Sequence, residues 1–213
     1  AGTFTFTRQL SLDANGVTVR GMGGEATILD FSGQISGANG IIITGNGVTI
    51  ADLQVFDTPG DGIRGDKIDD ITFDGVHVIW PDSASMDNGA YGLYPVQCNG
   101  VTIRNCLVEG SRDAGLYVGQ STQILVEDNE ARGNVAGIEI ENSTDAIVRR
   151  NHAHDNTGGI LVFNLPGLDV GDGKRTNVYE NIIENNNVPN FGVPGTTVSL
   201  IPPGVGVLVL AAD

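Results

Sequence analysis

The chain has 213 residues, of which 26 are acidic and 11 are basic, so its net charge is −15. Nucleic acid and anionic membranes are poor partners for such a chain, because affinity for them rests on Lys and Arg that meet phosphate groups. A neutral or cationic ligand fits better, and an anionic polymer would need a cation bridge or local basic residues. The alternative is that the acidity only keeps an exported protein in solution.

The rest of the composition indicates the structural class of the protein. Glycine is abundant at 31 residues, and short apolar runs alternate with Asn, Asp and Gly, which is typical of short strands joined by tight turns. No apolar stretch approaches the ~18 residues of a membrane span. No charged-then-apolar leader precedes Ala1, so we expect a signal peptide to be absent or already removed. Two cysteines exclude a disulfide framework and zinc-ligand spacing, and whether Cys98 pairs with Cys106 stays open.

Residues 1–38 open the chain with a strict alternation over Thr3–Thr7, in which Phe4 and Phe6 fall on one side of a strand. Further strand-like spacing follows up to Val19, and residues 21–37 are irregular. We interpret 1–38 as an irregular cap coil, because the terminal repeat of a solenoid must cover an otherwise open core.

A repeat of about 22 residues begins near Gly40. Its marker glycines include Gly92, Gly115, Gly137 and Gly159, and three apolar columns follow them through the chain. The columns are Ile41, Ile63, Leu93, Leu116, Ile138, Ile160 and Val207; Ile50, Phe73, Ile103, Val126, Val148 and Val178; and Val55, Val78, Val108, Ala131, Ala153 and Ile183. Three short strands per coil predict a parallel β-helix of about seven to eight coils, forming one domain over 1–213 with regular coils over 39–213.

Asparagines recur at two further positions of the repeat. One column holds Asn129, Asn151 and Asn181, with Cys106 at the same position, and the other holds Asn134, Asn156 and Asn186. Asn tolerates left-handed backbone at turns, and stacked amides can hydrogen-bond along the coil axis. We therefore expect internal ladders at the turns in preference to sugar or ice contacts.

Three insertions make the repeat longer than about 22 residues, at 80–90, 164–176 and 187–203. The first and third leave from the corner before the first strand of a coil, and the second leaves from the corner after it. All three should flank the face formed by the first strands. Insertions on one face of a repeat protein often mark its binding face.

The outward residues of that face are the candidate ligand-binding residues. Tyr94 and Tyr117 fall on adjacent coils, with Arg64 on one side and Glu139 on the other, and Tyr91 flanks them. Aromatic faces stack on the C–H surface of a sugar ring while charged groups take its hydroxyls. The alternative is an ordinary solvated sheet face, since Tyr is a good strand former.

Weaker candidates for chemistry also exist. A glycosidase pair could combine Asp113 with Glu139 or Glu141, or Asp82 with Asp87, although sequence cannot supply their separation. Asp169 and Asp172 resemble calcium ligands, but their spacing misses the EF-hand pattern, so Ca²⁺ is a minor possibility and no other cofactor is implied. The histidines, His77, His152 and His154, fall on the third-strand side and are interpreted as surface residues.

The stretch Tyr91-Gly92-Leu93-Tyr94-Pro95-Val96 resembles the catalytic segment of mannuronan C5-epimerases, whose motif is Tyr-Gly-x-Asp-Pro-His. Those enzymes are right-handed parallel β-helices that act on alginate. Tyr94 stands at the Asp position, Val96 at the His position, and Gly119 where a further acidic residue is expected. Only Tyr91 therefore carries over, as a binding residue.

A broader resemblance covers about residues 40–210. Phrases such as Asp113–Ser121 and Gly158–Phe163 are similar to those of secreted bacterial parallel β-helix repeat proteins of the carbohydrate-binding and sugar-hydrolase type. The resemblance implies an all-β, right-handed, single-stranded parallel β-helix.

Together these patterns predict an exported protein, periplasmic, cell-surface or extracellular, that binds a carbohydrate or polysaccharide on its first-strand face, with no catalysis evident. One alternative is a polysaccharide lyase, epimerase or hydrolase acting in the same groove. Another is a structural module: residues 207–213 form a first strand without the rest of its coil, and an apolar, uncapped strand favours end-to-end association. That strand also favours the interpretation of the chain as a fragment of a longer solenoid.

Overall fold

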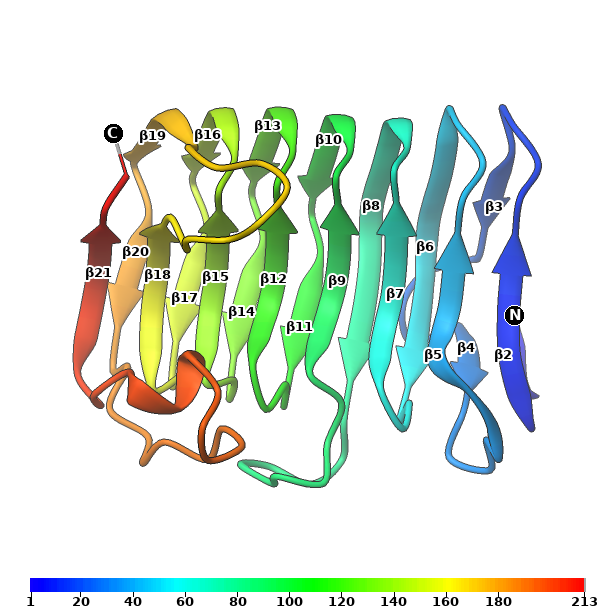
Figure 1. The fold of residues 1–213 in the computed structure, drawn as a ribbon. Helices are drawn as coiled ribbons and strands as arrows, with labels where there is room; N and C mark the ends of the chain where they lie inside the picture. Colours follow the sequence, from blue (N-terminus) through cyan, green and yellow to red (C-terminus); the bar gives the residue numbers. More distant parts are fainter. Residues whose placement is uncertain (213) are drawn as a thin grey trace.

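The computed structural model describes residues 1–212, which form a parallel β-helix (Figure 1). An 8-stranded parallel sheet, here the front sheet, contains the first strand of every coil. Its strands, in spatial order, are β2 (Arg8–Leu12), β5 (Ser36–Ile43), β7 (Asp61–Asp66), β9 (Tyr91–Val96), β12 (Ala114–Gly119), β15 (Ala136–Glu141), β18 (Gly158–Phe163) and β21 (Val205–Leu210).

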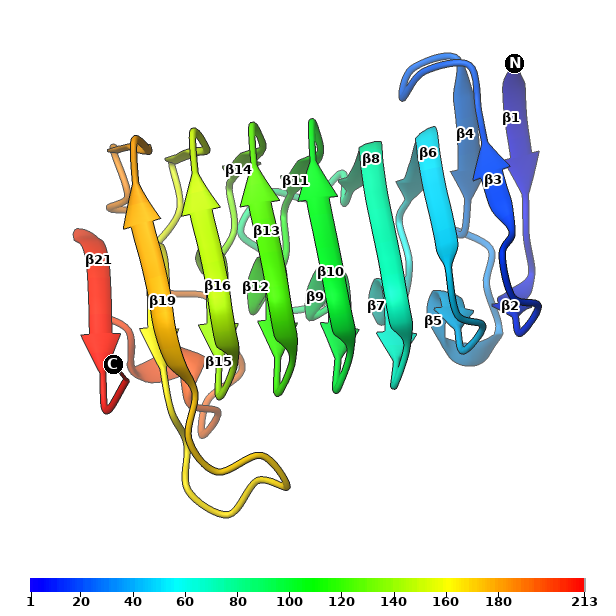
Figure 2. The same cartoon turned by 90° about the horizontal axis from the view of Figure 1, so that it is seen from above.

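The remaining strands form a 13-stranded parallel sheet that makes the other two sides of each coil (Figure 2). The second strands are β3 (Thr18–Arg20), β6 (Val48–Phe56), β8 (Asp69–Ile79), β10 (Asn99–Arg104), β13 (Thr122–Glu127), β16 (Thr144–Arg149) and β19 (Lys174–Tyr179). The third strands are β1 (Gly2–Thr5), β4 (Thr27–Asp30), β11 (Leu107–Glu109), β14 (Glu130–Arg132), β17 (His152–His154) and β20 (Ile182–Glu184), while β6 and β8 run through both sides. A single 3₁₀ turn, η1 (Val198–Leu200), interrupts the β structure of the described residues, and none of their helices is long and apolar enough to cross a membrane.

The predicted fold class and strand register are confirmed. Ile63 pairs with Leu93, and Leu116 with both Leu93 and Ile138, along the front sheet. Val148 pairs with Val178 in the second column. The three columns point inward and form one continuous core, because like residues stack at the ~4.8 Å spacing between coils.

Residues 1–38, predicted as an irregular cap coil, contain the four short strands β1 to β4. β2 pairs with β5 through a register shift, and β3 and β4 both pair with β6. The side chains of β1 and β3 are exposed, so this coil is less well buried than those that follow.

The predicted asparagine ladders are confirmed, and they lie inside the coil. The Nδ2 of Asn134 donates to Asn156 Oδ1 at 3.0 Å, and the Nδ2 of Asn156 donates to Asn186 Oδ1 at 2.9 Å. Asn129, Asn151 and Asn181 form the second ladder in the same way. The left-handed residue is the one that precedes each ladder Asn, for example Asp155 at φ 53°, which leaves the Asn amide free to point inward.

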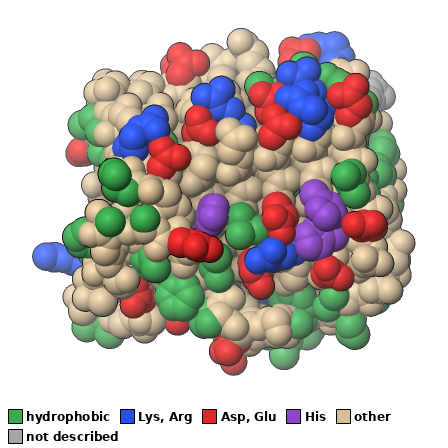
Figure 3. All heavy atoms as spheres, turned by 180° about the vertical axis from the view of Figure 1, so that it is seen from behind, with side chains coloured by type: hydrophobic (Ala, Val, Ile, Leu, Met, Phe, Trp, Pro, Cys, Tyr) green, Lys and Arg blue, Asp and Glu red, His purple; other side chains and the backbone are tan. Residues whose placement is uncertain are grey.

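Charged residues on the back of the solenoid pair across neighbouring coils (Figure 3). Arg104 meets Asp74 at 2.8 Å, Arg132 meets Glu109 at 2.9 Å, and Arg149 meets Glu127 at 2.8 Å. Arg150 and Arg175 make similar pairs with Asp128 and Asp145. Most of the chain's arginines are thus used on the back, which leaves few for the front.

Replacing Asn156 with Ala should lower the free energy of unfolding by about 2–4 kcal/mol, because it leaves several buried polar groups of neighbouring coils without partners. Asn156 is fully buried and makes four such bonds, including one to the Ala131 carbonyl at 2.9 Å. Urea unfolding followed by circular dichroism measures the change. Asn187→Ala, at an exposed loop position, is the control and should change it by less than about 0.5 kcal/mol. Equal effects of the two substitutions would contradict a stabilising ladder.

Candidate functional site

The outward side chains of the front sheet form rows that run across the coils. One row holds Arg64, Tyr94, Tyr117, Glu139, Leu161 and Leu208, because β-sheet register sets each beside the next. The next row holds Asp66, Val96, Gly119, Glu141, Phe163 and Leu210. All charged residues of these two rows thus lie on the earlier coils, and the last two coils carry only apolar residues in them.

A second apolar cluster, separate from the interior core, covers the outer side of the last coils. It contains Ala114, Tyr117, Val135, Ala136, Leu161, Phe163, Phe191, Val198 and Ile201. Phe191, Val198 and Ile201 come from the insertion at 187–203, which therefore folds back over the front sheet (Figure 1). Asn190 fastens that loop by donating hydrogen bonds to the carbonyls of Val198 and Ile201.

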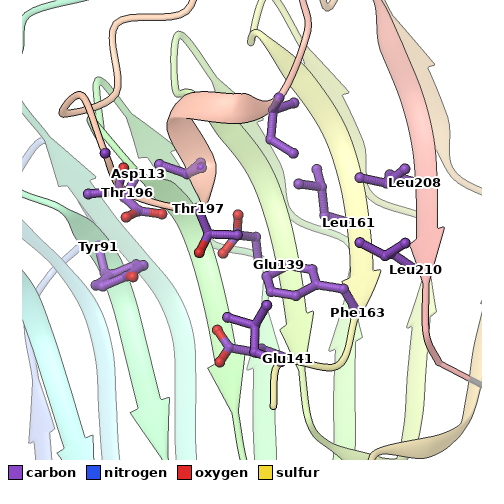
Figure 4. A pocket seen from close by; sticks show the side chains of 14 residues that line it. Tyr91, Asp113, Glu139, Glu141, Leu161, Phe163, Thr196, Thr197, Leu208 and Leu210 are labelled. Atoms are coloured by element: carbon purple, nitrogen blue, oxygen red, sulfur yellow. The ribbon is translucent and has the colours of Figure 1, made fainter. Parts of the chain in front are cut away.

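Between this loop and the sheet lies a cavity of about 380 Å³ (Figure 4). Its sheet side is lined by Tyr91, Asp113, Glu139, Glu141, Leu161, Phe163, Leu208 and Leu210. The loop supplies Gly195, Thr196, Thr197, Val198 and Ile201, and the insertion at 164–176 supplies Leu165. The sheet side of the cavity therefore has a carboxyl-bearing part and an apolar part that lie side by side, and the cavity volume is that of a small-molecule site.

Two of the three insertions build this cavity. The insertion at 164–176 is held against earlier coils, where Asn142 Nδ2 donates to the carbonyls of Leu165 and Val170 and Gln97 donates to Asp169 at 3.0 Å. The insertion at 80–90 contributes no residue to the cavity lining. It packs at the corner before the first strand, where the Met86 carbonyl accepts a hydrogen bond from Arg112.

The three tyrosines of the front sheet pack on one another at the edge of the cavity. Their ring centroids lie 4.5 to 4.8 Å apart, and the Tyr117 hydroxyl donates to Glu141 Oε2 at 2.9 Å. Tyr117 is only 4% exposed, and only Tyr91 lines the cavity. Tyr94 and Tyr117, which we expected to form a stacking platform, therefore belong to a packed cluster in which the two rings meet edge to face at 84°.

Gly119 explains why Tyr117 can lie flat. A Cβ at Gly119 would collide with the hydroxyl and ring atoms of Tyr117. The position at which the epimerase-like motif calls for an acidic residue is thus the space that the Tyr117 ring occupies. This local packing is incompatible with the catalytic pattern of that motif.

Arg64 lies beyond the tyrosines and outside the cavity lining. Its guanidinium carbon is 4.9 Å from the centre of the Tyr94 ring, and it makes an ion pair of 3.3 Å with Asp66. The second arginine of this face, Arg112, is turned to the Met86 carbonyl. No Lys or Arg lines the carboxyl-bearing cavity formed within residues 1–212.

Burial raises the pKa of all three cavity carboxyl groups, and repulsion by neighbouring carboxylates adds to the effect for Asp113 and Glu139. Burial, followed by the charge of Glu141, raises the pKa of Asp113 to about 7. Burial also raises the pKa of Glu139 well above its ordinary value, and the charges of Asp113 and Glu141 act in the same direction. The pKa of Glu141 is raised by burial, against the hydrogen bond from Tyr117. The site therefore holds one carboxyl group, Asp113, that titrates near neutral pH, and two others whose pKa is raised above the ordinary value.

Glu139 is the most unusual of these groups. Its side chain is 3% exposed, and within residues 1–212 its carboxyl group has neither a hydrogen-bond donor nor a basic partner, although it lines the cavity. Asp113 and Glu141 each have a tyrosine hydroxyl as partner. The acidic groups on the back of the solenoid, in contrast, are paired with arginine.

Asp61 belongs to this cluster, although its role was not predicted from the sequence. It pairs in register with Asn39, one coil before Tyr91, and burial raises its pKa to about 6 against the opposing charge of Arg64. Its position directly before the marker glycine Gly62, equivalent to that of Tyr91 before Gly92, was the available signal. The positions of Thr196 and Thr197 could not be predicted in this way, because the insertion that contains them lies outside the repeat.

The other candidates lie away from the cavity. Asp82 and Asp87 belong to the insertion at 80–90, and Asp172 lines a separate hollow with Asn164 and Lys174. Within 1–212 no group of three or more His, Cys, Asp or Glu is placed to hold a metal, and binding of Ca²⁺ by Asp169 and Asp172 stays a prediction. Cys98 and Cys106 are both free and buried.

The three histidines lie on the back of the solenoid, as expected (Figure 3). The His152 and His154 rings lie 4.0 Å apart, and each histidine meets a carboxylate, Glu184 for His152 and Asp155 for His154.

Comparison with known proteins establishes the family. Residues 39–211 match the family model described as the right handed beta helix region. The chain belongs to this family. The match spans every coil that contributes a strand to the cavity, and it starts where the regular repeat of the sequence begins.

The matches among solved structures include two polysaccharide lyases. The alginate lyase from Paenibacillus sp. str. FPU-7 is 14% identical, with a TM-score of 0.46, over 99% of this chain and 89% of that one. Pectate lyase Pel9A is also 14% identical, with a TM-score of 0.24, over 100% of this chain and 66% of that one. No protein with a curated description matches the chain.

The raised carboxyl pKa values predict a distinctive pH dependence of stability. A folded-state pKa above the unfolded value stabilises the fold at low pH, and this contribution is lost as pH rises through the folded pKa. For Asp113 that window runs from about 4 to about 7. Between pH 5 and pH 7.5 the melting temperature of wild type should therefore fall relative to that of Asp113→Asn. Differential scanning calorimetry measures both temperatures. A constant difference over this range would show that Asp113 titrates normally.

Tyr117→Phe should raise the pKa of Glu141, because it removes the O–H group that stabilises the charged carboxylate. Carbon-13 NMR of labelled glutamate side chains measures this pKa directly. Tyr179→Phe, on the back of the solenoid, is the matched control and should leave it unchanged. A fall in the Glu141 pKa in Tyr117→Phe would contradict the observed hydrogen bond.

Proposed function

We propose that the chain binds a carbohydrate in the cavity between the front sheet and the loop at 187–203. The observation that carries this proposal is that apolar side chains and carboxyl groups lie side by side in one cavity. Phe163, Leu161 and Leu208 offer an apolar surface to the C–H face of a sugar ring, and the neighbouring carboxyl groups accept hydrogen bonds from its hydroxyls.

The charge of the cavity narrows the class of sugar. Asp113, Glu139 and Glu141 line it, and neither Arg64 nor Arg112 reaches it. A uronate would bring a further negative charge into this surrounding, and its repulsion would be strong because the site is shielded from water. The ligand is therefore an uncharged or cationic sugar, in agreement with the acidic composition of the chain. Export, as predicted from the sequence, would place the protein where such polymers occur.

Binding should be tested with a panel of neutral, cationic and uronate oligosaccharides by isothermal titration calorimetry. Phe163→Ala should weaken binding about tenfold or more, equivalent to about 1.4 kcal/mol, because it removes the aromatic part of the apolar surface. Tyr179→Ala, an exposed aromatic residue on the back of the solenoid, is the matched control and should bind like wild type. The proposal fails if wild type binds no member of the panel, or if Phe163→Ala and Tyr179→Ala behave alike.

The raised pKa of Glu139 and the hydrogen bond that Glu141 accepts from Tyr117 favour a second candidate function, hydrolysis of a glycosidic bond. In this reaction the protonated Glu139 gives its proton to the leaving oxygen as the bond breaks. The Glu141 carboxylate takes a proton from the attacking water, whose oxygen bonds to the sugar carbon. The two residues lie two apart on β15 and line the same cavity, and their unlike partners separate their proton affinities.

Release of reducing ends from the same panel tests this candidate. Glu139→Gln and Glu141→Gln should each reduce the rate by at least about a hundredfold, which is typical of losing a general acid or base. Binding without any release of reducing ends would leave the protein a carbohydrate-binding module and exclude hydrolysis of that panel.

A further inference from the structure

The charge balance of the cavity identifies the class of sugar more closely, and this inference rests on the proposed function. Three carboxyl groups line one wall, Asp61 lies close enough to Asp113 to raise its pKa, and no basic side chain of the described residues joins the lining. On the back of the same solenoid, stacked acidic residues alternate with arginine at distances of 2.6 to 2.9 Å. The fold therefore pairs several of its carboxylates with arginine, whereas none of the three carboxyl groups that line the cavity has a basic partner among the described residues.

The surroundings of Glu139 indicate which chemical group would be its partner. The Glu139 side chain is 3% exposed and lines the cavity, and no group of residues 1–212 donates a hydrogen bond to its carboxyl oxygens. A buried carboxyl group without a donor costs free energy that a ligand can recover by supplying one. An ammonium group supplies three N–H donors and a positive charge, whereas a hydroxyl supplies one donor and none of the charge.

The remaining lining shows what carries this ammonium group. Leu161, Phe163 and Leu208 add an apolar surface beside the carboxyl groups, and a bare metal ion would leave this surface without a partner. Thr196 and Thr197 add hydroxyls at the loop side. A pyranose ring with a free amine combines these features: C–H groups on one face, hydroxyls at its edge and one positive charge.

We propose that the cavity binds a sugar with a free amino group, such as a deacetylated hexosamine unit, with its ammonium group against Glu139. The neighbouring carboxyl groups of Asp113 and Glu141 add to the attraction. The ammonium group neutralises the mutual repulsion of these carboxyls, so binding is coupled to the release of protons from the cavity. Acetylation of the amine removes both the charge and two donors, and it therefore weakens binding.

Calorimetric titration at pH 6 with the trisaccharide of glucosamine, the trisaccharide of N-acetylglucosamine and a neutral glucose trisaccharide tests the inference. The glucosamine form should bind about tenfold or more tightly than the acetylated form, as expected for one partly buried charge pair. Glu139→Gln should reduce this ratio to about threefold or less. The matched control, Glu109→Gln on the back of the solenoid, should leave the ratio unchanged.

A measurement on wild type alone covers the case in which Glu139→Gln fails to fold. Titrations in two buffers of different ionisation enthalpy should reveal a net release of protons when the glucosamine form binds at pH 6, and none for the glucose form. Equal affinity for acetylated and free amine, or binding of glucosamine without proton release, overturns the inference but leaves carbohydrate binding intact. Absence of binding by all three sugars overturns this inference, and only absence across the wider panel overturns the proposed function as well.

Discussion

The hydrogen-bonded register between successive coils is the constraint on which the rest of the structure depends. Each front strand pairs with its neighbours in parallel, so a residue and its equivalents about 22 positions later stand beside one another. Inside the coil this register stacks Ile on Ile and Asn on Asn, and it closes the amide ladders. Outside the coil the same register sets Tyr117 beside Glu139 and Gly119 beside Glu141. The register that stacks the interior thus also places the site residues side by side, while the outer positions carry a more varied set of residues than the inner ones.

Carboxyl groups have different partners on the two sides of the solenoid. On the back, Arg149 and Arg150 share Glu127, and such exposed pairs contribute modestly to stability. On the front, Glu139 is buried without a basic partner, which opposes folding and persists because the surrounding strands hold it in place. Groups that oppose folding in this way concentrate at functional sites, where a ligand supplies what the fold lacks.

Sequence reasoning predicted the fold in detail and the site in part. The apolar columns and the asparagine ladders follow from the repeat of about 22 residues and from the residue types at each position. Val148 pairs with Val178 across an insertion, so the strand register could be predicted even where a long loop separates two coils. The gathering of Asp113, Glu139 and Glu141 also follows from register. Two features did not follow. The ring of Tyr117 turns onto Gly119 and becomes buried, and the loop at 187–203 folds back to roof the cavity with Val198 and Ile201. Both depend on side-chain packing outside the repeat, where no periodic constraint applies.

The pKa of Glu139 tests most directly whether the fold keeps a carboxyl group without a partner in the proposed ligand-binding cavity. Carbon-13 NMR titration of the free protein should give a pKa well above the ordinary value of a glutamate, and saturation with an amino sugar should lower it. An ordinary pKa in the free protein, or one that the bound sugar leaves unchanged, would contradict the account.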